Sequence, residues 1–178
     1  MPRRARSLLL CAAAVCALFA SGCRAKIGDA CNVSTDCSLL GDRICDLSHR
    51  IAGRGECTIE GCGRDSCPKE GACVKAYGTD FLSVSCDPER EDKSAVAPEG
   101  ATLPPRDDCL AHEVCLPEGL CADEVSARTS CRRKCSEASD CRGGYECRIT
   151  GSNGIYHTPD PRDPTNDGQI RICMPLSD

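Results

Sequence analysis

Residues 135–147 read CSEASDCRGGYEC, in which three cysteines are separated by two gaps of five residues. An Asp stands directly before the second cysteine, and a Gly stands three residues before the third. An Asp side chain in such a place can hydrogen-bond its own backbone, and glycine can adopt the positive φ of a tight turn. The stretch therefore predicts two cysteine-held turns, with short strands beside the second.

The same spacing recurs along the chain. Sixteen cysteines fall into four sets of four, with first gaps of four or five residues, second gaps of five or seven, and third gaps of 9 to 25. CNVSTDC (31–37) shares the Asp, and CPKEGAC (67–73) and CLPEGLC (115–121) share a Glu-Gly pair. We interpret the chain as repeats of one module, although Cys131 can also be assigned to the last set. The sets are Cys31, Cys37, Cys45, Cys57; Cys62, Cys67, Cys73, Cys86; Cys109, Cys115, Cys121, Cys131; and Cys135, Cys141, Cys147, Cys173.

Cysteine dominates the composition, at 19 of 178 residues, which is typical of disulfide scaffolds in oxidising compartments. The chain has no C-x-x-C pair, which disfavours structural zinc and thioredoxin-type redox chemistry. With two Phe, three Tyr and no Trp, the apolar core must be small, and disulfides must hold the fold. The predicted fold class is small and disulfide-rich, mostly irregular with short β-hairpins, in two lobes of two modules each.

The first 22 residues are typical of an export signal. Arg3, Arg4 and Arg6 precede an apolar run over residues 8–20, which is shorter than the ~20 residues that a membrane-spanning helix needs. We therefore predict a cleaved signal peptide over residues 1–22. Removing its three arginines, with no acidic residue, changes the net charge from −5 to −8.

Cys23 follows this signal directly, after the small residues Ala20, Ser21 and Gly22. This ending resembles the lipobox of bacterial lipoproteins, with Ala20 where leucine is usual. The resemblance implies cleavage after Gly22, a lipid on Cys23 and anchoring in a bacterial membrane. It also implies that Arg24, in the place of a retention aspartate, favours the outer membrane over the inner one.

The cysteine count bears on the same residue. Once Cys11 and Cys16 leave with the signal, 17 cysteines remain, and a lipid on Cys23 leaves 16, an even number that can pair completely. An ordinary secretory signal, which would give an unlipidated secreted chain with one unpaired cysteine, is the alternative.

Residues 135–147 are also similar to the cysteine-rich repeats of the Dickkopf N-terminal and colipase-like families. The similarity implies small β-fingers that bind protein partners, and it carries over no catalytic residue. A first-to-third and second-to-fourth disulfide pairing within each module fits this similarity. The sequence itself leaves the pairing open.

Residues 87–108 have the composition of a linker, with four prolines, ten charged residues, and neither an aromatic residue nor a cysteine. The expected organisation is a signal peptide (1–22), a lipidated tether (23–30), a cysteine-rich lobe (31–86), this flexible linker, and a second cysteine-rich lobe (109–178).

Local patterns add a few secondary-structure expectations. Strands are expected at 145–150 and 169–174, and a hairpin at 74–86. A short helix is expected within 123–134, and an extended loop over 151–168.

Two acidic residues are weak calcium candidates. Asp163, Thr165, Asp167 and Gly168 match part of a calcium-loop pattern, but Thr165 replaces an acid or amide and Met174 stands where a glutamate is required. A turn-rich surface loop is the favoured interpretation, and no metal or cofactor is expected.

The remaining polar candidates are scattered. His49, His112 and His157 have no ligand or base partner at a useful spacing, so they are interpreted as surface-loop histidines. The basic run at 132–134 lies between two cysteines and is interpreted as a solvated loop, or alternatively as a loop, with Arg133 as its key residue, that inserts into a protease.

The acidic balance disfavours a nucleic-acid partner, and no nucleophile elbow or phosphate-binding glycine loop is present. The sequence favours a non-catalytic, membrane-anchored lipoprotein with an interaction or structural role. Its expected partners are the membrane, through the lipid, and a protein, with no small-molecule substrate. The alternatives are a disulfide-stapled protease inhibitor and an unlipidated secreted protein.

Overall fold

The computed structural model describes residues 24–78, 84–90, 108–159, 162 and 168–176. Within these residues, the helices are α2 (Ser34–Cys37) and a 3-10 turn at Ala138–Asp140. The remaining regular structure consists of short antiparallel strands cross-linked by eight disulfides. The predicted small, disulfide-rich fold with short β-hairpins is therefore confirmed.

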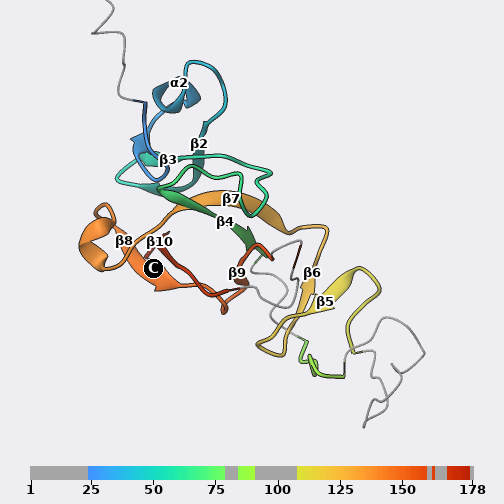
Figure 1. Ribbon diagram of the computed structural model, residues 1–178. Coiled ribbons are helices and arrows are strands. Elements are labelled where there is room, and N and C mark those ends of the chain that lie inside the picture. Colours follow the sequence, from blue (N-terminus) through green and yellow to red (C-terminus); the bar gives the residue numbers. More distant parts are fainter. Residues whose placement is uncertain (1–23, 79–83, 91–107, 160–161, 163–167, 177–178) are drawn as a thin grey trace, which may run out of the picture.

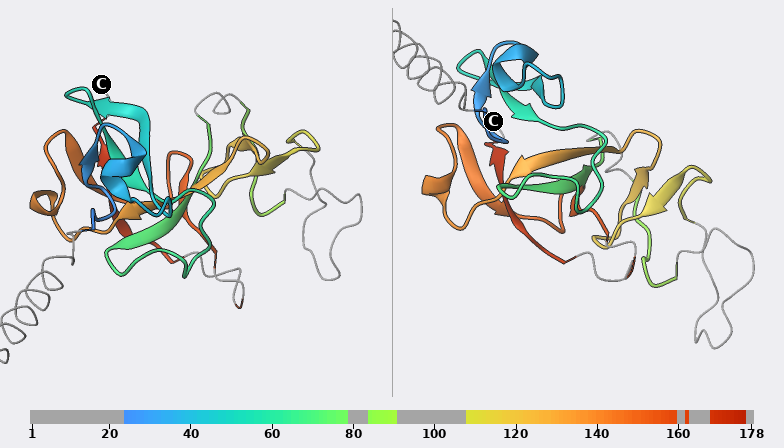
Figure 2. Two further views of the ribbon diagram at one scale, coloured as in Figure 1. Left: turned by 90° about the horizontal axis from the view of Figure 1, so that it is seen from above. Right: turned by 45° about the horizontal axis from the view of Figure 1, so that its top comes forward.

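The described strands form four small sheets. In sheet order they are β1 (Ala30–Cys31), β3 (Arg54–Thr58) and β2 (Ile44–Ile51); β7 (Arg128–Arg133), β4 (Gly71–Ala76) and β9 (Ile155–His157); β10 (Arg171–Pro175) and β8 (Tyr145–Ile149); and β5 (Glu113–Cys115) and β6 (Cys121–Asp123). Figures 1 and 2 show α2 and the first sheet at one end of the molecule and β5–β6 at another, with the β7–β4–β9 sheet between them.

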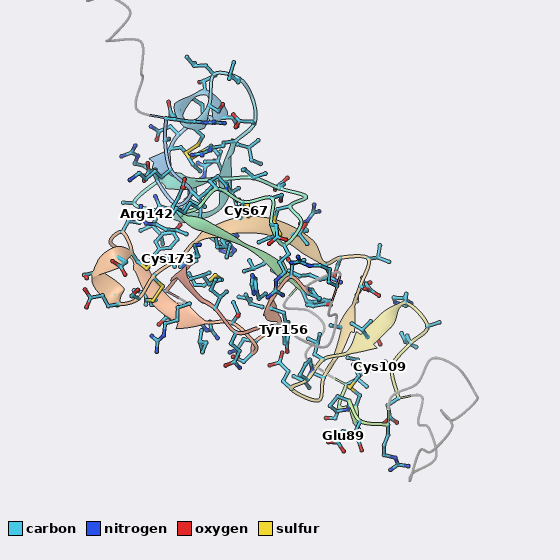
Figure 3. The ribbon with its side chains drawn as sticks, in the orientation of Figure 1. Cys67, Glu89, Cys109, Arg142, Tyr156 and Cys173 are labelled. Carbon is cyan, nitrogen blue, oxygen red and sulfur yellow. A yellow bond between two sulfur atoms is a disulfide. The ribbon has the colours of Figure 1, made fainter. Side chains whose placement is uncertain are left out.

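One arrangement of cysteines and strands occurs four times. In each case two cysteines face each other across an antiparallel strand pair, and each bonds back to one of two cysteines that come earlier in the chain. The facing pairs are Cys45 and Cys57, Cys73 and Cys131, Cys115 and Cys121, and Cys147 and Cys173. The disulfides are Cys31–Cys45, Cys37–Cys57, Cys62–Cys73, Cys67–Cys131, Cys86–Cys115, Cys109–Cys121, Cys135–Cys147 and Cys141–Cys173 (Figure 3).

Each unit thus pairs its first cysteine with its third and its second with its fourth. We name the units by their cysteines. They are the first unit (Cys31, Cys37, Cys45, Cys57), the second unit (Cys62, Cys67, Cys73, Cys131), the inserted unit (Cys86, Cys109, Cys115, Cys121) and the last unit (Cys135, Cys141, Cys147, Cys173).

Two of these units differ in membership from the sets read off the sequence. Cys131 bonds Cys67 instead of closing the third set, and Cys86 bonds Cys115 instead of closing the second. The inserted unit therefore lies within the chain between β4 and β7, inside the second unit. Consecutive cysteines cannot reveal this, because the two strands of a hairpin can be joined by a connection of any length.

Because the inserted unit lies inside the second unit, residues of the two expected lobes pair directly with each other. Strand β4 belongs to residues 31–86 and β7 to residues 109–178, yet they pair directly over six residues. The Cys67–Cys131 disulfide crosses the same division. The expected linker, 87–108, falls between the first two cysteines of the inserted unit, and most of it lies outside the described residues.

The core is built largely from cystine sulfur. Among the described residues, nine of the seventeen buried apolar side chains are cysteines, and the largest fully buried aliphatic ones are Ile27, Val74 and Ile172. One cluster surrounds Ile27 with the sulfurs of the second unit, and another joins Val74 to Ile172 of the last unit. A core this small cannot hold the chain without its cross-links.

The Asp that precedes the second cysteine has the same role in two units. Asp36 accepts hydrogen bonds from the backbone N–H groups four and three residues before it, at 2.8 and 3.2 Å. Asp140 does the same at 2.7 and 3.1 Å. These donors hold the pKa of both carboxyls below its usual value. The predicted turn is therefore built by a carboxylate that must be ionised to accept both bonds well.

The glycines before the third cysteine follow the prediction in part. Gly119 and Gly144 have φ of 79° and 82°, in the left-handed region that glycine adopts easily. A side chain at Gly144 would also meet Ile51, since a Cβ there would lie 2.4 Å from the Ile51 Cγ2. Gly71 differs, because it has no positive φ and instead opens β4 beneath Ile27.

Of the other local predictions, some are confirmed and others are wrong. The strands expected near 145–150 and 169–174 are present as β8 and β10. The helix expected within 123–134 is wrong, because β7 occupies its second half and pairs along the whole of β4. The loop expected over 151–168 contains β9. The hairpin expected at 74–86 is wrong, because both edges of β4 are paired, with β7 and with β9, and Ser85 bridges Leu120 instead.

Candidate functional site

The N-terminal end of the described chain is held against the loop that follows α2. Arg24 forms an ion pair with Asp42, and the Arg43 guanidinium donates to the carbonyl of Ala25. Arg43 is buried, so the second contact is well shielded from water. Cys23 lies outside the described residues, but its peptide bond to Arg24 places it within one residue of this fixed point.

The loop between α2 and β2 carries the two most exposed of the large apolar side chains in the described structure. Leu39 and Leu40 are each 89% exposed. Ser38 Oγ accepts the Leu40 N–H at 3.1 Å and donates to the Asp42 carboxylate. Cys37 fixes the start of the loop through its disulfide. The leucine pair is therefore presented by a braced loop beside Arg24.

The first and second units meet through buried ion pairs. Arg132 on β7 contacts Glu56 and Asp46 of the first sheet, and these three side chains are 11%, 5% and 13% exposed. Burial opposes ionisation of Asp46, but the Ser48 N–H at 2.9 Å and the nearby Arg132 hold the pKa of Asp46 below its usual value. Thr58 Oγ1 adds a buried hydrogen bond to a β7 carbonyl at 2.7 Å.

This arrangement corrects the interpretation of residues 132–134 as a loop. Arg132 and Arg133 belong to β7, and Arg133 lies 3.4 Å from Asp29. A protease-binding loop must project a free side chain, whereas Arg132 and Arg133 lie on a paired strand and form ion pairs. These ion pairs could not be predicted from the sequence, because Asp46 and Asp29 lie 86 and 104 residues upstream of their arginine partners and at no fixed spacing.

Glu118 joins the inserted unit to the segment that contains β9, beside a Lys75–Glu124 ion pair at 3.0 Å. Glu118 accepts hydrogen bonds from the backbone N–H groups of Asn153 and Gly154, at 2.7 and 2.8 Å, and from the Tyr156 hydroxyl at 3.1 Å. Tyr77 packs edge-on against Tyr156, with ring centroids 6.2 Å apart. Burial, followed by the charge of Glu118, raises the pKa of Tyr156. No motif marked Glu118, whose role depends on contacts between distant segments.

One polar cleft has a volume of about 490 Å³ and is lined by residues that include Asp46, His49, Glu60 and Arg128. Its charges are of both signs, and Asp46 is already engaged by Arg132. A second cleft of about 450 Å³ lies beside Glu70 and Arg171 and is also of mixed charge. Ser48 and His49 both line the first cleft, but no hydrogen bond joins their side chains in the described structure.

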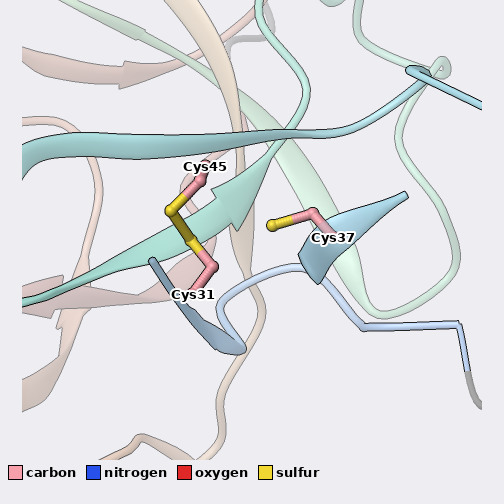
Figure 4. A group of neighbouring side chains, drawn as sticks. All are labelled: Cys31, Cys37 and Cys45. Atoms are coloured by element: carbon pink, nitrogen blue, oxygen red, sulfur yellow. A yellow bond between two sulfur atoms is a disulfide. The ribbon is translucent and has the colours of Figure 1, made fainter. Parts of the chain in front are cut away.

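Several cysteine groups are close enough to resemble metal sites. Figure 4 shows one of them, in which the sulfurs of Cys31, Cys37 and Cys45 lie within 4.8 Å of one another. Cys31 bonds Cys45, and Cys37 bonds Cys57. Each cysteine-containing group of this kind in the described structure includes a disulfide, so its sulfurs are not the free thiolates that bind metals.

The three histidines lie in different elements, and of them only His112 is in a turn, as the surface-loop interpretation expected. His49 is exposed on β2 and His112 is exposed in a turn, whereas His157 is half-buried on β9 with its Nδ1 2.8 Å from the Gly168 carbonyl oxygen. The calcium candidates Asp163 and Asp167 lie outside the described residues.

In the part of the chain that the structure describes, no helix has the length and apolar character needed to cross a bilayer. Comparison with protein-family models, with curated proteins and with solved structures finds no match to this chain.

Proposed function

We propose that the chain is a lipoprotein whose cysteine-rich ectodomain is anchored to a bacterial membrane, preferentially the outer one, through lipid on Cys23. The ectodomain has a non-catalytic role in protein interaction or structure. The signal at residues 1–22 and the small residues before Cys23 motivate this proposal.

The observation that carries it is the complete pairing of the other cysteines. All sixteen cysteines from Cys31 to Cys173 are joined to one another. Cys23 therefore has no partner among the cysteines that follow it, and those that precede it, Cys11 and Cys16, lie within the proposed signal. A lone cysteine at the end of an export signal is the residue that a lipobox would modify.

The architecture supports a role in presenting one end of the molecule. The first unit holds Arg24, next to the anchor, while β5 and β6 of the inserted unit lie far from α2 (Figure 1). Buried ion pairs join the first unit to the second, and the Glu118 contacts join the inserted unit to residues 153 and 154. A cross-linked body of this kind would carry the inserted unit away from the membrane as a rigid spacer.

Intact mass spectrometry of protein extracted from membranes tests the anchor. The expected mass is that of a chain beginning at Cys23, with acyl groups on Cys23 and with sixteen fewer hydrogens than the reduced chain. A Cys23→Ala variant should be neither lipidated nor retained in the membrane fraction. Recovery of mature wild-type protein with a free Cys23 thiol would refute the proposal and favour an unlipidated secreted protein.

A further inference from the structure

An exposed pair of leucines, Leu39 and Leu40, lies on the loop whose Asp42 pairs with Arg24, next to the proposed anchor. We propose that the loop carrying Leu39 and Leu40 is a second membrane contact, which inserts both side chains into the surface of the bilayer that holds Cys23. This inference rests on the proposed function, because it requires the lipid on Cys23 to bring the membrane to this end of the molecule.

The first observation is the exposure of the loop. Each leucine is 89% exposed, and Val33, on the other side of the short helix α2, is 54% exposed. Apolar side chains of this size are normally withdrawn from water, and an adjacent pair at the tip of a braced loop favours contact with an apolar phase. The loop is exposed but not unsupported. The hydrogen bonds of Ser38 hold its shape, and the Cys37–Cys57 disulfide holds its start.

The second observation, the position of the anchor, favours a membrane as the apolar phase that the leucines contact. The chain leaves the described structure at Arg24, which is ion-paired with Asp42, two residues beyond Leu40. Consecutive Cα atoms lie 3.8 Å apart, so the lipid-bearing residue is held within a few ångströms of the position of Arg24. A bilayer that accepts the acyl chains of Cys23 would therefore lie close to Arg24 and to Asp42, which belongs to the leucine loop.

The charges of this surface are compatible with such contact. Asp42 is the carboxylate nearest to the leucines in sequence, and a free carboxylate would resist approach to lipid. Its pairing with Arg24 neutralises it. Arg24 thus acts on the geometry of the anchor: with Arg43, which holds the carbonyl of Ala25, it fixes the angle at which the ectodomain meets the membrane.

Tryptophan fluorescence tests the contact directly, because the chain has no Trp of its own. Leu40→Trp places a single probe in the loop, and Leu39→Trp is a second variant in case the first fails to form its eight disulfides. Val125→Trp is the control, since Val125 is 83% exposed and comes two residues after β6, a strand that lies far from α2 (Figure 1). Each lipidated protein is reconstituted in phosphatidylcholine vesicles with or without brominated acyl chains.

Leu40→Trp should emit at shorter wavelength than Val125→Trp, and only its emission should be quenched by brominated lipid. Equal emission and no quenching, in a sample whose mass shows acylated Cys23, would overturn the leucine contact and leave the proposed function intact. If the mass instead shows a free thiol, the proposed function fails, and the Cys23 thiol is coupled to a maleimide lipid in the same vesicles. Quenching of Leu40→Trp then supports the loop as a membrane contact, and its absence overturns it.

Discussion

Removing the Cys67–Cys131 disulfide by the double substitution Cys67→Ala and Cys131→Ala should destabilise the protein by about 4 kcal/mol. The bond joins residues 64 apart, but the Cys86–Cys115 disulfide bypasses 29 of them, so the loop that it closes has about 35 residues. In the chain-entropy model, closing a loop of about 35 residues removes roughly 13 cal/mol/K from the unfolded state, or ~4 kcal/mol at 25 °C. The matched control, Cys135→Ala with Cys147→Ala, opens a loop closed over 12 residues and should cost ~3 kcal/mol.

Urea unfolding followed by near-ultraviolet circular dichroism, with the remaining disulfides intact, measures both losses. The Cys67–Cys131 variant should lose more than the control, because its loop is longer and because Ile27 packs against the sulfurs of this unit. A loss below about 1 kcal/mol would refute the reasoning.

The nested disulfide arrangement behind that prediction can be tested by proteolysis of a protein in which all eight disulfides are intact. A protease site inserted after Pro98 allows the chain to be cut between Cys86 and Cys109. Both the Cys67–Cys131 and Cys86–Cys115 bonds span this cut, so the two fragments should separate on a gel only after reduction. Fragments that separate without reduction would mean that the cysteines pair within residues 31–86 and within 109–178, contrary to the nested arrangement.

Three further predictions concern charged groups. The pKa of Asp36 and Asp140 is lowered by backbone N–H donors, so their stabilisation is present above the unfolded pKa near 4 and is lost as pH falls through the folded pKa. Thermal unfolding of the double variant Asp36→Asn with Asp140→Asn should therefore depend less on pH between 2 and 5 than that of wild type. An unchanged pH dependence would contradict this. Because the pKa of Tyr156 is raised by burial and by Glu118, absorbance at 295 nm should show a tyrosine that ionises above the usual pH, and Glu118→Gln should make it ionise earlier. The stabilisation from Tyr156 is intact below pH 10 and is lost as pH rises through the raised pKa. Arg132→Met leaves its buried carboxylate partner unpaired and should cost about 3–5 kcal/mol in urea unfolding, and a loss below ~1 kcal/mol would show that the pair is unimportant.

Local sequence is sufficient to predict the unit itself. The two five-residue gaps, the Asp before the second cysteine and the Gly before the third act within a few residues of one another. They specify turns whose hydrogen bonds and φ values are found at Asp140 and Gly144. The scarcity of large apolar residues likewise predicts a core of disulfides, which the burial of nine cysteines bears out.

The predictions that were wrong concern residues whose structure depends on partners distant in the sequence. The segment 128–133 has no strong strand pattern of its own and becomes β7 because β4 lies alongside it, from more than fifty residues earlier in the chain. The same pairing carries Arg132 against Glu56, which turns an apparently solvated basic run into a buried contact. Neither result follows from spacing, since ion pairs between separate units have no periodicity that a single sequence displays.

The error in assigning Cys131 and Cys86 has a physical basis that applies to the whole repeat. In every unit the third and fourth cysteines face each other on paired strands, so the chain between them is a strand connection whose length the unit does not constrain. Loop-closure entropy grows only as the logarithm of length, so lengthening this connection from the sequence separation of about 12 in the first unit to about 58 in the second costs roughly 1.5 kcal/mol. That cost is smaller than the stabilisation of ~3 kcal/mol from one short-loop disulfide, and the inserted unit brings two of its own. The third-to-fourth gap is therefore the place where this architecture can accept a complete extra unit, and the order of cysteines along the chain is a guide to pairing only for the first three of each unit.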